Sequence, residues 1–167
     1  MINRVLYWVL VLALQFFLLN HLDISAYLIP QVFIILLITL PLHISKIKQV
    51  LIAFAIGLLA DFFVSTPGIH ASACLWLILL RMFILGRQDL KQHEANKLPY
   101  YVNVVGLVPF IYTVTILVLF YHFYVFWLES IGAVNGVTFT LTSLFSSFFA
   151  LTIISVVQFV SLRNSGE

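Results

Sequence analysis

The fold can be predicted from the stretch Gly57-Leu-Leu-Ala-Asp-Phe-Phe-Val-Ser-Thr-Pro-Gly-Ile-His-Ala71. Asp61 is the one carboxylate that lies within an apolar run of the sequence, and Thr66-Pro67-Gly68 ends that run. A second apolar run begins at His70-Ala71. A carboxylate inside the hydrocarbon of a membrane is costly, and its presence by default indicates a role. The stretch therefore predicts two transmembrane helices that are joined by a tight turn and carry one buried acidic residue.

The composition of the whole chain is that of a membrane protein. Apolar residues make up 63% of the sequence and charged residues 8%, whereas a soluble domain carries about 25% charged residues. At about 20 residues for each spanning helix, 167 residues accommodate roughly five to six helices and leave no room for a soluble domain. We predict an all-α, polytopic membrane protein that forms one domain over residues 1–167.

The apolar runs and the polar breaks between them define the expected helices. Pro30 suits the first turn of the second helix, where a missing N–H costs nothing, and Pro41 is expected to kink or end that helix. Residues 86–99 form the longest polar segment and are expected to be a solvated loop. The six predicted transmembrane helices cover residues 4–22, 27–44, 49–65, 70–86, 102–127 and 138–162.

The basic residues predict the orientation of this six-helix arrangement. An even number of spans puts both termini on one side, and every Lys and Arg falls on that side or in the nearer half of the membrane. The opposite loops contain Asp23, Glu129 and the Thr66-Pro67-Gly68 turn. Because basic residues concentrate in cytoplasmic loops, we predict that both termini are cytoplasmic. The basic residues are Arg4, Lys46, Lys48, Arg81, Arg87, Lys91, Lys97 and Arg163.

Asp61 allows two structural interpretations and one weaker functional one. Gly57 lies four residues earlier and shares its helix face, which favours a close helix contact beside the carboxylate. In one interpretation, Asp61 forms an ion pair with Arg81 on the neighbouring helix. In the other, Arg81 extends to the cytoplasmic headgroups, while Asp61 makes local hydrogen bonds near the outer end of its helix. A proton relay is disfavoured, because no second carboxylate lies within an apolar run.

The remaining reactive residues do not form a catalytic or metal-binding pattern. Cys74 is alone, which excludes an intramolecular disulfide and a redox pair. The histidines show no spacing typical of a metal site, and His70 is interpreted as a residue at the start of a helix near the membrane surface. Ser143 and Ser147 lie one turn apart on a face suited to close helix packing, which favours packing within the protein over the docking of a partner. We therefore predict no enzymatic activity, no cofactor and no metal.

The pattern Gly57-Leu-Leu-Ala-Asp61 followed by Pro67-Gly-Ile-His-Ala71 resembles the signature of the rod shape-determining protein MreD family. Pro30 resembles the proline in the second helix of that family. The resemblance covers roughly residues 28–86, and the second half of the chain agrees only in hydropathy and length. The residues of this pattern, together with Arg81 as the possible partner of Asp61, are the candidates for structural or partner-surface roles: Pro30, Gly57, Asp61, Pro67, Gly68, His70, Ala71 and Arg81.

The resemblance also implies a function. MreD proteins are non-enzymatic components of the bacterial inner membrane that bind MreC and, through it, the MreB filament and the RodA/penicillin-binding-protein pair that builds sidewall peptidoglycan. No nucleic acid is implied. Their fold is similar to that of the substrate-binding S components of energy-coupling-factor vitamin transporters, which supplies an alternative function. S components carry Ala-x-x-x-Ala on the first helix, whereas Ala13 is followed here by Phe17.

Overall fold

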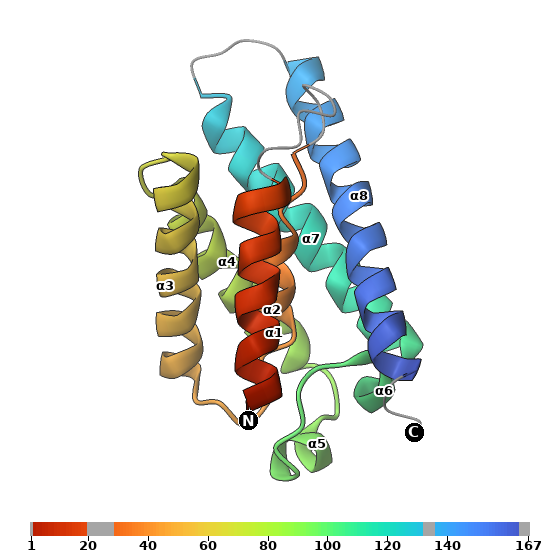
Figure 1. Cartoon of the computed structure of the whole chain (residues 1–167). Helices are drawn as coiled ribbons and strands as arrows, with labels where there is room; N and C mark the ends of the chain where they lie inside the picture. Colours follow the sequence, from red (N-terminus) through yellow and green to blue (C-terminus); the bar gives the residue numbers. More distant parts are fainter. Residues whose placement is uncertain (1, 20–28, 132–135, 164–167) are drawn as a thin grey trace.

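In a computed structural model the chain is a bundle of helices (Figure 1). The structure describes residues 2–19, 29–131 and 136–163, with the backbone alone at 2–5 and 159–163. Within these ranges, five long helical segments run along the bundle, and four short ones lie between them in the sequence. The long segments are α1 (Ile2–Ala13) with its π-helical continuation η1 (Leu14–Leu18), α3 (Lys46–Val64), α4 (Ile69–Leu85), α7 (Leu107–Glu129) and α8 (Gly136–Arg163). The short segments are η3 (Val32–Ile34), α2 (Ile35–Ile38), α5 (Lys91–Ala95) and α6 (Val102–Val105).

Three of the helices in the described part of the chain are long and apolar enough to cross a membrane. They cover Lys46–Val64, Leu107–Glu129 and Gly136–Gln158. Two shorter apolar helices, Leu6–Leu18 and Ile69–Leu85, accompany them. The described residues contain helices and no strands. The predicted all-helical class, compatible with a membrane bundle, is therefore confirmed, and the number of six spans stays a prediction.

The predicted second helix, residues 27–44, is wrong as a continuous span. Of its described residues, 29–44, only Val32–Ile38 are helical, as one short 3-10 turn followed by one α-helical turn. Pro30 precedes the helix, and Pro41 pairs instead with Pro99 in an isolated antiparallel bridge. Neither proline has a backbone N–H to extend a helical ladder. We call residues 29–44 the central segment. Its helical part is almost completely buried among the long helices.

The predicted fifth helix, residues 102–127, is also divided. Gly106 separates α6 from α7 and has φ +88°, a backbone conformation that residues other than glycine rarely adopt. Helical hydrogen bonding resumes at once, because the amide of Phe110 donates to the carbonyl of Gly106. The other four predicted helices correspond to helices of the structure. The first matches α1 with η1, the third α3, the fourth α4 and the sixth α8, and their described ends agree within a few residues.

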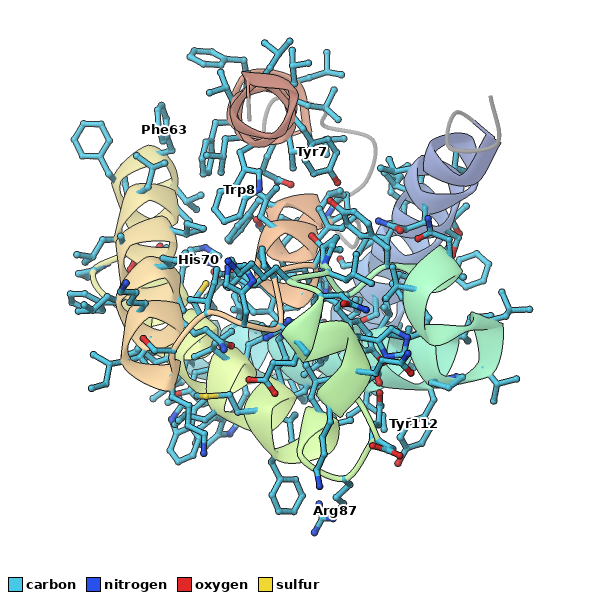
Figure 2. All side chains as sticks on the ribbon, turned by 90° about the horizontal axis from the view of Figure 1, so that it is seen from below. Tyr7, Trp8, Phe63, His70, Arg87 and Tyr112 are labelled. Carbon is cyan, nitrogen blue, oxygen red and sulfur yellow. The ribbon has the colours of Figure 1, made fainter. Side chains whose placement is uncertain are left out.

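Two helical hairpins enclose the central segment (Figure 1). One is α3 and α4, and the other is α7 and α8, with α4 packed against α7. Figure 2 shows α1 at the outside of the bundle with Tyr7 and Trp8 directed inward. Ser143 and Ser147 are buried, which confirms the prediction that their face of α8 packs within the protein.

The two ends of the bundle differ in charge. Helices α1 and α3 begin and α4 and α8 end at the same end, which we call the basic end (Figure 1). All eight lysines and arginines of the sequence belong to the helix termini or connections of this end. The α3–α4 turn lies at the opposite end, where α7 also ends at Glu129.

Candidate functional site

Asp61 binds the beginning of the next helix. One carboxylate oxygen, Oδ1, accepts hydrogen bonds from the backbone N–H of His70 (2.8 Å) and from the Thr66 hydroxyl (2.9 Å). The other, Oδ2, accepts from the backbone N–H of Ala71 (2.9 Å). The first amides of a helix have no acceptor within that helix, and the helix dipole favours a negative charge beside them. Asp61 is therefore a cap for α4 that is supplied by α3.

Gly57 allows the two helices to approach closely enough for this cap. A Cβ atom at Gly57 would lie 2.5 Å from Ala71 Cα and 2.8 Å from the carbonyl oxygen of His70. Both are backbone atoms, so no side chain can move aside to make room. The turn itself requires left-handed backbone at Ser65 (φ 59°) and at Gly68 (φ 82°), between which Pro67 lies. Glycine at 57 and at 68 thus follows from the geometry of this hairpin.

Arg81 holds the end of the central segment. Its Nε donates to the carbonyl of Ile38 (3.0 Å) and one terminal nitrogen to the carbonyl of Leu40 (2.6 Å). The other terminal nitrogen donates to Oε1 of Gln49 (2.8 Å), whose amide in turn donates to the carbonyl of Ile44. Arg81 therefore supplies the donors that a helix would have provided had it continued through Pro41.

These contacts decide between the two interpretations of Asp61. Asp61 makes local hydrogen bonds, as the second interpretation predicted, and the Asp61–Arg81 ion pair is not formed, because both side chains have other partners. The prediction that Arg81 extends to the headgroups is wrong, since only 1% of the residue is exposed. The carbonyls released by the break at Pro41 keep the guanidinium inside.

Gln15 holds the other end of the central segment. Its side-chain oxygen accepts a hydrogen bond from the backbone N–H of Val32 (2.7 Å), and its amide donates to the carbonyl of Pro30 (3.1 Å). Gln15 is 1% exposed and lies in the π-helical turn at the end of α1. A side chain from η1 therefore caps the short helix, because Gln31 at its N-terminus provides no side-chain cap.

Two further helices complete the hydrogen bonding of this region. The backbone N–H of Gln31 donates to Nε2 of His122 in α7 (3.1 Å), and that of Ile29 donates to the Ser146 hydroxyl in α8 (2.9 Å). Since Nε2 of His122 accepts a hydrogen bond, the proton lies on Nδ1, which faces the carbonyl of Val118 at 2.9 Å. His122 is thus a neutral imidazole with both nitrogens occupied.

His70 also contributes its side chain to the interior. Nδ1 lies 2.7 Å from the Tyr121 hydroxyl, and Phe33 of the central segment packs edge-on against both rings. All three residues are at most 1% exposed, and Figure 2 shows His70 inside the bundle. His70 lies at the start of α4, as predicted, with its side chain turned into the protein, and its position near the membrane surface stays a prediction. The start of α4 is joined by its backbone to α3 and by its side chain to α7.

The residues predicted from the sequence fall into two groups in the structure. Gly57, Asp61, His70 and Ala71 meet at one contact between α3 and α4, with Pro67 and Gly68 in the adjoining turn. Pro30 and Arg81 lie instead at opposite ends of the central segment. The polar residues that bind the central segment were not predicted, although each interrupts or borders an apolar run. They are Gln15, Gln49, His122 and Ser146.

The arrangement is one of structural hydrogen bonds to backbone groups. The described residues contain no group of three or more His, Cys, Asp or Glu side chains able to hold a metal ion. Comparisons with known protein families, with curated proteins and with solved structures give no match. The class to which the sequence and the fold point is a helical membrane protein with a broken, hydrogen-bonded helix at its centre.

Proposed function

We propose that the chain is a non-enzymatic scaffold of the bacterial cell-elongation machinery. One observation carries this proposal. The residues that resemble the MreD signature, Gly57, Asp61 and Gly68-x-x-Ala71, are those that lock α3 to α4. If a family keeps a sequence pattern because its fold needs it, the pattern should lie at a close helix contact such as that between α3 and α4. It should also consist of residue types that the contact requires. The resemblance therefore coincides with the part of the fold that most restricts sequence.

The proposal includes a location and partners. The chain crosses the bacterial inner membrane six times with both termini in the cytoplasm, which is supported by the gathering of Lys and Arg at the basic end. An MreC-type membrane protein is its direct partner. Through that protein the chain acts with MreB and the RodA/penicillin-binding-protein pair to control cell shape and sidewall peptidoglycan synthesis.

The alternative, a substrate-binding S component, is less well supported. That function requires a ligand cavity at the outer end of the bundle. With the termini in the cytoplasm, the outer end is the one that contains the α3–α4 turn. The interior next to that turn is occupied by the rings of Phe33, His70 and Tyr121, which pack against one another. A scaffold has no need of a cavity there.

Co-purification and depletion test the proposal together. The tagged chain is expressed with an MreC-type single-pass protein, extracted in mild detergent and analysed for a complex of fixed stoichiometry. An unrelated single-pass protein with the same tag is the matched control. We expect a complex with the MreC-type protein alone, and rounded cells when the chain is depleted from its host. Cells that stay rod-shaped, together with a vitamin retained by the purified chain, would support the S component instead.

A further inference from the structure

A pocket lies at the basic end of the bundle, between the start of α3 and the end of α4. Its volume is about 250 Å³, slightly less than the roughly 300 Å³ at which pockets for drug-sized ligands begin. Buried Arg81 and Gln49 contribute to its inner wall, whereas its other polar residues are exposed. The polar residues that line it are His43, Ser45, Lys46, Gln49, Arg81 and Glu94.

The charge of Arg81 makes this pocket unusual. The three acceptors of the guanidinium are two backbone carbonyls and the amide oxygen of Gln49, all of which are neutral. A guanidinium has five N–H donors, and among the described residues three of them have acceptors. A buried cation whose partners are neutral is costly unless an anion is also supplied. Arg81 therefore faces the pocket with an uncompensated charge and with donors to spare.

Two more features of the lining favour an anion. Lys46 brings a second positive charge to the opening of the pocket. The first turn of α3, a helix of 19 residues, begins at the same place without a side-chain cap, so its amides present partial positive charge. Glu94 on α5 is the single acidic residue of the lining, and it is exposed.

The location of the pocket indicates the source of the anion. Helix α3 is apolar enough to cross a membrane, so its first turn lies at the level of the lipid headgroups. Ile47 and Leu51, one turn apart beside Lys46, are exposed by 75% and 61% and offer apolar surface to acyl chains. Basic pockets between transmembrane helices on the cytoplasmic side bind anionic headgroups.

We propose that the pocket between α3 and α4 binds a phosphate group, namely the headgroup phosphate of an anionic membrane lipid. Arg81 and the first turn of α3 bind the phosphate oxygens, and Lys46 adds charge at the opening. The volume admits a headgroup, while the acyl chains stay outside along α3. The bound phosphate neutralises Arg81 and thereby stabilises the hydrogen bonds of Arg81 to the central segment. This inference rests on the orientation proposed above and is independent of the proposed partner.

Lipid binding to the full chain tests the proposal. The purified protein in detergent is titrated with phosphatidylglycerol, with phosphatidylcholine and with inorganic phosphate, and bound species are counted by native mass spectrometry. Lys46→Gln is the test variant, because Arg81→Gln also removes contacts within the fold. Lys48→Gln is the matched control, since Lys48 is also exposed, lies in the same helical turn and does not line the pocket.

We expect phosphatidylglycerol to bind more tightly than phosphatidylcholine. Lys46→Gln should weaken that binding about fivefold, the effect of one basic residue near an anionic headgroup, and Lys48→Gln should leave it unchanged. Glu94→Gln should strengthen it, because it removes the one negative charge of the lining. Equal losses in the two lysine variants, or equal binding of the two lipids, would overturn the proposal.

Two other results would also decide against it. If inorganic phosphate binds with the same dependence on Lys46 while phosphatidylglycerol binding does not change, the pocket takes free phosphate and the lipid source is wrong. If Glu94→Gln lowers the thermal stability of the lipid-free protein by several degrees, Glu94 is the counter-charge of Arg81 and no external anion is needed.

Discussion

Replacing Asp61 with asparagine leaves the shape of the α3–α4 hairpin unchanged and alters one acceptor and one charge. The asparagine oxygen can still accept from Thr66 and His70, whereas its NH₂ group must face the N–H of Ala71. A buried donor left without an acceptor costs about 1–3 kcal/mol. Loss of a negative charge at a helix N-terminus adds up to about 2 kcal/mol. We expect Asp61→Asn to lower the free energy of unfolding by about 3 kcal/mol.

The measurement is the free energy of unfolding in mixed micelles, from an equilibrium titration with a denaturing detergent. Asp89→Asn is the matched control, because Asp89 is exposed in the connection between α4 and α5. That variant should change the free energy of unfolding by less than about 0.5 kcal/mol, as is usual for surface substitutions. An equal effect of the two replacements would refute the assignment of Asp61 as a cap.

A double-mutant cycle separates the cap from an ion pair. Asp61 and Arg81 share no hydrogen-bond partner in the structure. The losses in Asp61→Asn and Arg81→Gln should therefore add within about 0.5 kcal/mol. If the double variant loses markedly less unfolding free energy than the sum of the two single losses, the two charges interact and the reasoning above is wrong.

Three further outcomes follow from the same contacts. Gly57→Ala should destabilise the protein by about 1–3 kcal/mol, because the new Cβ would overpack against backbone atoms. Gly136→Ala is the control and should not destabilise it, because nothing lies within 4 Å of its new Cβ. Equal melting temperatures of the two variants would contradict this prediction. Gln15→Leu should increase hydrogen exchange at Val32 and Phe33, whose amides lose their side-chain acceptor, and unchanged exchange there would exclude Gln15 as a cap. Arg81→Lys should lower the unfolding free energy by about 2 kcal/mol or more, because an ammonium cannot reproduce three fixed bonds; exposed Arg87→Lys is the control, and an equally small effect of both would contradict a structural role for Arg81.

The α3–α4 hairpin could be predicted because its determinants are close together in the sequence. Gly57, Asp61 and Gly68 lie within twelve residues of one another. Helical spacing and turn chemistry therefore suffice to place the glycine beside the carboxylate. The sequence did not decide whether Asp61 pairs with Arg81 or with nearby backbone amides. The two arrangements differ by a rotation of α3 and α4 about their axes, which the hydropathy pattern does not specify.

The central segment could not be predicted, for a physical reason. Residues 27–44 have the length and the hydropathy of a spanning helix, and prolines are tolerated in membrane helices where neighbours satisfy the freed groups. Here the neighbours do so with the helix broken. Gln15, His122 and Ser146 bind backbone groups far away in the sequence. No pattern within one run of residues contains that information, although each polar side chain in an apolar run marks a residue that needs a partner.

The hydrogen bonds of the central segment also impose an order of assembly. The chain is synthesised from its N-terminus, and the acceptors for Ile29 and Gln31 are 117 and 91 residues further along. Until α7 and α8 have entered the membrane, the backbone N–H groups of Ile29 and Gln31 have no acceptor from these helices. The central segment then either carries unpaired N–H groups in the hydrocarbon or stays at the membrane surface. The central segment can therefore reach its folded position only after α8 has been made, 117 residues beyond Ile29.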